Sequence, residues 1–538
     1  MELPRLIEAL TNPAAYPHPV DTVEVRQTHI SVVFLAGAFA YKLKKPVSLG
    51  FLDFSTLEKR RHFCHEELTL NRRLADGTYL DVVPVVATPE GPRFGDSGEV
   101  IEWAVKMRRL PPDATLLAML ERGEASRELV QAVARRIAAF HRRSETNERI
   151  TSHGRFESVA RNFVDVLARI RPNAGISATV FQRIHDLVHA DLARLRRLIE
   201  SRADHGKIRH GHGDLHLDHV YVFPDREPPA DLVIVDCIEF HEQFRCLDPV
   251  ADMAFVVMDL TFRGRRDLAR AFAETYFLAA EDDEGWALLP LYTAYRATIR
   301  GMVDSVLQSE TEVPAAEREA AMERSRAYGL LALGELESPG RRPALVLVAG
   351  PPGTGKSTVS AALAGRAGFT VIRSDVVRKE LAGVPPQEPT PPERTGSLYS
   401  QEATDRTYAE CLARAGAVLA EGGRVIVDAT FREEHRRLAF HDAARRFGVP
   451  FVMLCCEASP ATIRPRLASR RDDPSDADWN TYQQHAATWQ EPGPEIRRVL
   501  HTITTDGLPE AVSELALQAL CQSDLAPEPG FQETSRDG

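Results

Sequence analysis

The second half of the chain alternates short apolar runs with amphipathic stretches of helical period. The apolar runs lie at 345–349, 370–372, 425–427, 451–455 and 501–504, and the helical stretches between them include 401–421, 434–447 and 459–470. This alternation is typical of a parallel sheet covered by helices on both faces, with ligands bound at the carboxyl ends of the strands. We therefore expect an α/β domain in this half.

The first half has a different pattern. Alternating apolar and polar positions predict strands at 23–29, 31–36 and 39–44, a helix over 56–74, and strands near 82–86 and 100–107. Between residues 114 and 211 the sequence is almost entirely helical. We expect an α+β domain with a strand-rich lobe over about 20–110 and a helical lobe over about 111–338.

Two breaks divide the chain. The helical segment 314–336 ends in the breaker Glu337-Ser338-Pro339-Gly340, just before the apolar run that begins at 345. This break places the boundary between domains 1–338 and 339–522. Residues 523–538 are polar and contain Pro and Gly, so we expect a disordered tail there.

Composition narrows the class of protein. With 538 residues, 43% of them hydrophobic and 27% charged, the chain has the composition of an ordinary globular protein. Its net charge of -11 argues against general binding to nucleic acid or anionic membranes. Nucleic-acid binding by a local basic groove remains an alternative for the C-terminal domain. Seven cysteines without a C-x-x-C pair predict buried free thiols. We find no signal peptide and no apolar run of membrane-spanning length, so we expect a cytoplasmic protein.

The most specific motif follows the apolar run 344–349. It reads Gly350-Pro351-Pro352-Gly353-Thr354-Gly355-Lys356-Ser357-Thr358 and leads into a helical stretch. In this G-x-x-x-x-G-K-[ST] pattern, the glycines let backbone N–H groups surround a phosphate and the lysine reaches the β- and γ-phosphates, while the serine hydroxyl ligates Mg²⁺. An ordinary Gly/Pro loop is the alternative. We predict that residues 350–358 bind a nucleoside triphosphate with Mg²⁺.

Charged side chains near the strand ends add candidates for chemistry. Asp375 is placed to accept the proton of an attacking hydroxyl, and Arg378 to bind an anionic group of the substrate. Asp428 ends the third apolar run and suits the Mg²⁺ shell or the substrate. Arg466 and Arg470 share one helix face and would close over the phosphates as catalytic arginines. The alternatives are a helix N-cap for Asp375 and a solvated face for the arginines.

Residues 344 to about 520 resemble the small P-loop kinases of the polynucleotide-kinase and zeta-toxin kind. The matching pieces are the phosphate-binding loop, S-D-x-x-R-K at 374–379, V-D-A-T-F at 427–431 and the arginine helix. The resemblance implies transfer of a γ-phosphoryl group to a hydroxyl. A mechanical AAA-type ATPase is the alternative, but that class usually has Asp-Glu at the end of the third strand, whereas here Ala429 follows the aspartate.

The first half carries a second constellation. His210-Gly211-His212-Gly213-Asp214-Leu215-His216 precedes an apolar run that ends in Asp236. This order resembles the catalytic and metal loops of aminoglycoside-phosphotransferase-like kinases, which share the two-lobed fold of protein kinases. The resemblance implies that Asp214 accepts the proton of the substrate hydroxyl, that Asp236 holds Mg²⁺, and that Asp252 fixes the catalytic loop.

The same resemblance assigns a phosphate clamp upstream. Lys42 matches the third-strand lysine that clamps the α- and β-phosphates, and Lys44, on the same face of that strand, is the fallback. Glu67 on the first long helix would be its ion-pair partner, with Glu66 as the alternative. A hairpin over 27–37 would cover the phosphates, although it lacks G-x-G-x-x-G. For each of these charges an ordinary surface salt bridge is the competing interpretation.

One position departs from the family pattern. The second metal ligand of that family is an asparagine five residues after the catalytic aspartate, and here the position holds His219. Imidazole is a poor Mg²⁺ ligand compared with an oxygen donor. We take His219 as a metal-ligand candidate beside Asp236, with three alternatives: Asp218 substitutes for it, one metal is used, or this half is weakened or inactive as a kinase. A transition-metal site built from several histidines is a further alternative, involving His210, His212, His216 and His219.

Together the two resemblances cover about 20–335 and 343–520, and they match a bacterial fusion of an aminoglycoside-phosphotransferase-like domain with an AAA-family P-loop kinase domain. The fusion implies an ATP- and Mg²⁺-dependent phosphotransferase with two nucleotide sites and a small-molecule hydroxyl acceptor that the sequence does not identify. The alternative is a nucleotide-sensing regulator. In that case the first domain is a pseudokinase and only the P-loop domain turns over ATP.

Overall fold

The computed structural model describes residues 2–50, 52–170, 175–309, 313–388, 396–469 and 474–527. The chain divides into two compact units, of which the first comprises Met1–Arg161, Leu195–Thr261 and Arg265–Tyr292, and the second Asn162–Arg194, Phe262–Gly264 and Thr293–Gly538. The second unit thus includes helical segments upstream of residue 339. The boundary between domains 1–338 and 339–522 that we placed from the sequence therefore remains a prediction.

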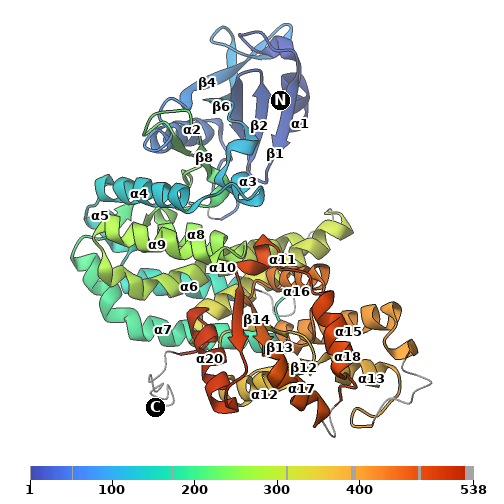
Figure 1. Cartoon of the computed structure of the whole chain (residues 1–538). Coiled ribbons are helices and arrows are strands. Elements are labelled where there is room, and N and C mark those ends of the chain that lie inside the picture. The colour runs from blue at the N-terminus through green and yellow to red at the C-terminus, as the bar shows by residue number, and fades with distance from the viewer. Residues whose placement is uncertain are drawn as a thin grey trace. The chain divides into compact units, whose positions relative to one another are not determined.

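A six-stranded antiparallel sheet organises the start of the first unit (Figure 1). Its spatial order is β1-β2-β3-β6-β4-β5. The strands are β1 (Val23–Gln27), β2 (Ser31–Ala36), β3 (Phe39–Lys44), β4 (Tyr79–Thr88), β5 (Gly91–Phe94) and β6 (Glu99–Arg108). The sequence predicted all of them except β5, which has only four residues and no clear alternation.

Each face of this sheet packs against a helix. Helix α1 (Leu3–Leu10) belongs to an apolar cluster that contains Tyr41 of β3. Helix α2 (Leu57–Asn71) belongs to the cluster on the other face. Because successive side chains of a strand point to opposite faces, Tyr41 faces α1 whereas Lys42 and Lys44 face α2.

Two short ladders carry the segments that resemble catalytic and metal loops. Strand β7 (Arg209–His210) pairs with β10 (Cys246–Leu247), and β8 (Val220–Val222) pairs with β9 (Leu232–Ile234). Residues 211–219 lie between β7 and β8, and Asp236 follows β9. The helices of residues 110–340 are α3 (Leu116–Glu121), α4 (Arg127–Arg143), α5 (Glu148–His153), α6 (Phe156–Arg169), α7 (Ala178–Asp204), α8 (Pro249–Phe262), α9 (Arg266–Ala280), α10 (Leu289–Ser309) and α11 (Ala315–Leu336).

The second unit contains a parallel sheet of the predicted kind. Its order is β12-β13-β11-β14-β15, and every neighbouring pair is parallel. The five strands match the five predicted apolar runs, and they are β11 (Ala344–Ala349), β12 (Thr370–Arg373), β13 (Arg424–Asp428), β14 (Phe451–Glu457) and β15 (Leu500–Thr504). The expectation of an α/β domain with a parallel sheet is confirmed.

Helices on both faces create a binding crevice at the carboxyl ends of β11 and β13. Helices α12 and α20 pack with β11 in one apolar cluster. Right-handed crossovers place α15 and α16 on the opposite face, so the topological switch point lies between β11 and β13. The helices after β11 are α12 (Lys356–Ala367), α13 (Ser374–Leu381), α15 (Gln401–Ala420), α16 (Glu434–Arg446), α17 (Pro460–Ala468), α18 (Trp479–Ala487), α19 (Pro494–Arg497) and α20 (Pro509–Gln522).

Three further expectations concern the cysteines, the C-terminal segment and membrane-spanning helices. All seven cysteines are free thiols and six of them are buried, as predicted. We expected a tail from residue 523, but Leu525 and Ala526 are buried, and the rest of that segment, 528–538, lies outside the described residues. Among the described helices, none has the length and apolar character needed to cross a bilayer.

Candidate functional sites

The phosphate-binding loop joins β11 to α12, and its three glycines have positive φ angles. Gly350, Gly353 and Gly355 have φ values of 136°, 84° and 85°, a region that glycine adopts without strain. A Cβ on Gly350 would lie 2.5 Å from the main-chain oxygen of Cys456, and one on Gly353 would lie 2.8 Å from the Ile463 side chain. These two positions therefore have no room for a side chain, and a loop with glycine at such positions can bind a phosphate through its backbone.

The lysine and threonine of this loop bind its own backbone. Lys356 Nζ and Thr354 Oγ1 both donate to the main-chain oxygen of Pro351, at 3.0 and 2.8 Å. Helix α12 begins at Lys356, and its N-cap, Gly355, has no capping side chain. The partial positive charge of the helix N-terminus therefore adds to the lysine charge, and both favour an anion in the loop.

A cavity of about 450 Å³ brings the C-terminal candidates together. Lys356 and Ser357 line it from the phosphate-binding loop, Asp375 and Arg378 line it from α13, and Asp428 lines it from the end of β13. One cavity therefore joins the predicted phosphate-binding residues to the predicted acceptor-binding residues.

Asp428 is the most deeply buried carboxylate of this cavity, at 4% exposure. Burial raises the pKa of its carboxyl, while Lys356 and a hydrogen bond from Ser357 act in the opposite direction. Its Oδ2 has no hydrogen-bond partner among the described residues, and the nearest ion-pair partner is Arg373 Nε at 3.8 Å. A carboxylate oxygen beside the serine hydroxyl of the loop is the donor chemistry that Mg²⁺ prefers, so these residues fit that ion.

Asp375 lies in the first turn of α13. The N-cap of this helix is Arg373 and its first residue is Ser374, so the alternative interpretation of Asp375 as an N-cap is wrong. The side chain instead lines the cavity that Lys356 and Ser357 also line. Its role as the proton acceptor stays a prediction that this position supports.

Arg378 is a buried cation at the same cavity, at 8% exposure. Its Nη1 donates to the main-chain oxygen of Leu398 at 3.0 Å and to Thr404 Oγ1 at 3.1 Å, and its guanidinium lies 5.0 Å from the ring centre of Tyr399. Its Nε has no hydrogen-bond partner among the described residues. Arg378 therefore places a positive charge at the cavity, which favours an anionic group.

Of the two arginines that we expected to close over the phosphates, Arg466 and Arg470, the structure describes only the first. Arg466 donates from Nη2 to the main-chain oxygen of Thr505 at 2.7 Å, and it lines a second cavity of about 310 Å³ together with Gly353, Gly355 and Lys356. It therefore lies beside the phosphate-binding loop, and its catalytic role stays a prediction. Arg470 lies outside the described residues.

The sequence missed much of the cavity lining. These residues come from 399–408, from the segment after β13 and from 475–485, where no motif marks them. The larger ones are Tyr399, Tyr408, Arg432, Glu433, Arg436, Asp476 and His485. The available signal was topological, because segments that follow the strand ends of a parallel sheet gather at its binding edge.

In the first unit, one glutamate binds both candidate lysines. Lys42 Nζ lies 2.9 Å from Glu67 Oε1, and Lys44 Nζ lies 2.7 Å from Glu67 Oε2. Lys44 is 1% exposed and also pairs with Glu239, whereas the Lys42 side chain is 14% exposed. Lys44 is therefore a structural cation, and Lys42 is the one that can reach a ligand. The other candidate partner, Glu66, contacts Arg245 at 3.4 Å.

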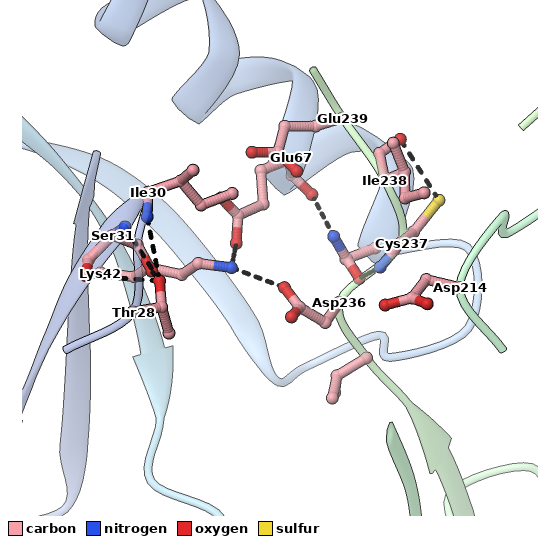
Figure 2. Close-up of polar contacts among 12 residues, drawn as sticks. Thr28, Ile30, Ser31, Lys42, Glu67, Asp214, Asp236, Cys237, Ile238 and Glu239 are labelled. Carbon is pink, nitrogen blue, oxygen red and sulfur yellow. Dashed lines mark hydrogen bonds and ion pairs between the residues drawn. The ribbon is translucent and has the colours of Figure 1, made fainter. Parts of the chain in front are cut away.

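Lys42 also reaches the predicted metal ligand (Figure 2). Its Nζ lies between Glu67 and Asp236 and is 2.5 Å from Asp236 Oδ1, while Asp214 comes from a neighbouring segment. Burial lowers the pKa of Lys42, but the carboxylates of Asp236, Glu67 and Glu239 outweigh it and hold this pKa well above its ordinary value. The lysine is therefore a fixed positive charge.

Asp236 has a strained backbone directly after β9. Its φ is 64°, in the left-handed region that residues other than glycine seldom adopt. Such strain is typical of functional sites. Burial raises the pKa of its carboxyl, but the neighbouring positive charge of Lys42 outweighs this effect, so the net shift is downward and the group is ionised.

The segment 210–216 is tied to α8 by Asp252. This fully buried carboxylate accepts hydrogen bonds from the backbone nitrogens of His212 and Gly213 at 2.7 and 2.9 Å, and it lies 3.1 Å from His141 Nε2. A Cβ on Gly211 would lie 2.5 Å from its Oδ2. The expectation that Asp252 fixes this loop is confirmed.

Replacing Asp252 by Asn tests this anchor. The amide nitrogen of Asn would replace one of the two carboxylate oxygens of Asp252. The backbone N–H of either His212 or Gly213 would then lose its acceptor. An unmet buried donor costs about 1–3 kcal/mol, and we expect a fall in melting temperature of about 5 °C by calorimetry. Asp225→Asn, on an exposed aspartate of the same unit, is the matched control. Equal melting temperatures for the two variants would contradict the anchor.

The remaining candidates gather around Asp214. His216 Nε2 lies 3.3 Å from Asp214 Oδ2, and the other ring nitrogen of His216 is in close contact with Asp218. His219 Nδ1 lies 2.9 Å from the main-chain oxygen of Asp214, and His219 Nε2 lies 3.6 Å from Asp236 Oδ2. The structure therefore places Asp214, His219 and Asp236 together, whereas Asp218 faces His216 rather than Asp236.

Comparisons with known proteins add two kinds of similarity. Residues 345–492 match a family model described as an AAA domain. The chain is 34% identical over 465 residues to uncharacterized proteins of Mycobacterium tuberculosis and Mycobacterium bovis, and the match covers 86% of this chain and 89% of theirs.

Solved kinase structures resemble about a third of the chain. A gluconokinase from Sinorhizobium meliloti is 18% identical, with 34% of this chain and 94% of that chain covered and a TM-score of 0.26. A sugar kinase from Janibacter is 18% identical, with 34% and 99% covered and a TM-score of 0.26. A putative kinase from Chloroflexus aurantiacus is 20% identical, with 33% and 98% covered and a TM-score of 0.27. Scores this low carry no conclusion about the activity of this chain.

Proposed function

The chain belongs to the same family as these uncharacterized mycobacterial proteins, and we propose that it is an ATP- and Mg²⁺-dependent phosphotransferase with two nucleotide sites. Each site would transfer the γ-phosphoryl group to a hydroxyl of a small molecule. The AAA-domain match at 345–492 supports nucleotide use in the second unit. The observation that carries the proposal is the single cavity that Lys356, Ser357, Asp375 and Arg378 line together.

In the second unit, the proposed roles follow the cavity from the phosphates to the acceptor. Lys356 and the loop N–H groups hold the β- and γ-phosphates, and Ser357 with Asp428 would hold Mg²⁺, which neutralises phosphate charge. Asp375 takes the proton of the acceptor hydroxyl. Arg378, whose guanidinium lies beside the Tyr399 ring, places its positive charge at the cavity and binds an anionic group on the acceptor.

In the first unit, the proposed roles use the residues around Asp236. Lys42, held by Glu67, clamps the nucleotide phosphates, and Asp236 with His219 forms the metal position. Asp214 accepts the proton of the second acceptor, and Asp252 keeps its loop in place. The strained backbone of Asp236 supports a functional role for this segment rather than a purely structural one.

One observation favours a second candidate function. Lys42 Nζ is bound directly to Asp236 Oδ1, so the lysine expected to clamp the phosphates is paired with one oxygen of the expected metal ligand. Together with His219 in the place of an asparagine, this contact suits a pseudokinase that binds nucleotide and regulates the P-loop domain or a partner. Both candidates require two nucleotide sites, and they differ in whether Asp214 is needed for turnover.

The number of nucleotides bound per chain tests whether there are two nucleotide sites, which both candidate functions require. We expect two molecules of a non-hydrolysable ATP analogue per wild-type chain by equilibrium dialysis. We expect one per chain for Lys356→Ala and one for Lys42→Ala, because each change removes the main cation of one site. One molecule per wild-type chain, lost in only one of the two variants, would contradict the two-site proposal.

A further inference from the structure

His219 is oriented as a metal-ligating histidine would be. Its Nδ1 lies 2.9 Å from the main-chain oxygen of Asp214, and a carbonyl oxygen can only accept. The ring proton is therefore on Nδ1, and in the neutral imidazole Nε2 has a free lone pair. Histidine ligands commonly donate their second nitrogen to a carbonyl in this way, because the contact fixes both the tautomer and the ring plane.

The lone pair of Nε2 faces a carboxylate oxygen at the distance expected of two ligands on one ion. Nε2 lies 3.6 Å from Asp236 Oδ2, which is longer than an ordinary hydrogen bond. Two donors that are each about 2.1 Å from one ion lie about 3.0 to 3.4 Å apart in octahedral or tetrahedral geometry. A shift of a few tenths of an ångström would bring these two atoms onto a common ion.

The two oxygens of Asp236 have separate partners. Oδ1 lies 2.5 Å from Lys42 Nζ, while Oδ2 faces His219. The lysine contact therefore leaves Oδ2 available as a ligand. His216 does not face Asp236: one of its ring nitrogens lies 3.3 Å from Asp214 Oδ2 and the other is in close contact with Asp218.

We propose that the metal position of the first unit, formed by His219 Nε2 and Asp236 Oδ2, selects a divalent transition ion such as Mn²⁺ or Zn²⁺ over Mg²⁺. Imidazole nitrogen favours first-row transition ions, whereas Mg²⁺ prefers an all-oxygen shell. The proposal rests on the proposed nucleotide site, whose phosphate oxygens complete the shell. It differs from an ordinary Mg²⁺ site only in the ligand that His219 contributes.

Pulsed electron paramagnetic resonance on Mn²⁺ tests this ligand directly. The sample is the full chain with Mn²⁺ and a non-hydrolysable ATP analogue, and a bound imidazole produces a ¹⁴N coupling. We expect this coupling in wild type and its loss in His219→Asn. His65→Asn is the matched control, because His65 is an exposed histidine of the same unit, and the coupling should persist in it.

Competition between the two ions gives a second readout. We expect the wild-type site of the first unit to bind Mn²⁺ at least about tenfold more tightly than Mg²⁺, and His219→Asn to reduce this preference. Absence of ¹⁴N coupling in wild type, or coupling that survives His219→Asn, would overturn the proposal. An imidazolium ion pair between His219 and Asp236 would give the first of these results.

The outcome separates this proposal from the proposed function. If Asp214→Asn abolishes transfer while no ¹⁴N coupling exists, the phosphotransferase function stands and the metal assignment fails. If the coupling is present while Asp214→Asn has no effect on transfer, the metal site stands and the first unit is a regulatory module.

Discussion

Replacing Lys356 by Ala is expected to lower ATP turnover by the P-loop site about 10³-fold. The lysine lies at the start of α12 beside the phosphate-binding loop, and its charge offsets the charge that develops on the transferred group. Removing one fixed donor of this kind costs about 10²- to 10³-fold in kcat, and a full cation acts at least as strongly. Steady-state turnover with saturating ATP and an active acceptor is the measurement.

The matched control for this change lies on the same helix. Arg366 is near the end of α12, where it pairs with Glu514 at 2.7 Å and donates to Ser513. Arg366→Ala removes a cation of α12 far along the helix from the loop, so we expect turnover within a factor of about two of wild type. Equal losses in the two variants would show that Lys356→Ala acts through stability rather than through phosphate binding.

Replacing Asp214 by Asn is expected to abolish acceptor-dependent transfer at the first unit. The amide has nearly the same shape but cannot take the proton of the attacking hydroxyl. General-base catalysis contributes about 10²- to 10⁴-fold, so we expect kcat to fall about 10³-fold. The KM for ATP should change little, because Lys42 and Glu67 remain in place. Initial rates against ATP and acceptor concentrations separate the two parameters.

Asp225→Asn is the control for this variant as well, since it makes the same chemical change on an exposed side chain of the same unit. We expect it to retain wild-type transfer. A normal rate in Asp214→Asn itself would exclude Asp214 as the proton acceptor and would favour the regulatory interpretation of the first unit.

The sequence predicted the P-loop half well because its signals are local. The central strands β11, β13 and β14 are buried on both faces, so they appear as apolar runs without any knowledge of their neighbours. The phosphate-binding loop is likewise contiguous, and its glycines need only their own backbone conformation. Asp375 and Asp428 followed, because residues at adjacent strand ends meet at one edge of the sheet.

The sequence did not decide between Lys42 and Lys44. Both point to the same face of β3, and both contact Glu67 in the structure. What separates them is Glu239, which comes from a segment almost two hundred residues away and neutralises Lys44 in the interior. Such long-range pairing leaves no periodic signal along the chain.

The sequence also did not predict which residues line the acceptor cavity. Tyr399 and His485 belong to segments that meet only after the sheet has formed, and neither belongs to a motif. Arg378 was identified from its spacing to Asp375, but its stacking on Tyr399 was not foreseen. Contacts between loops depend on the tertiary fold rather than on local propensity.

The most direct test of two working sites is transfer of labelled γ-phosphate from ATP to acceptors by four proteins: wild type, Asp214→Asn, Lys356→Ala and the double variant. Hydroxyl compounds with and without an anionic group serve as acceptors. We predict two separable transfer activities, one lost in each single variant and both lost in the double variant. If Asp214→Asn retains every activity of wild type while Lys356→Ala abolishes all of them, the chain has one catalytic site and the account of two is wrong.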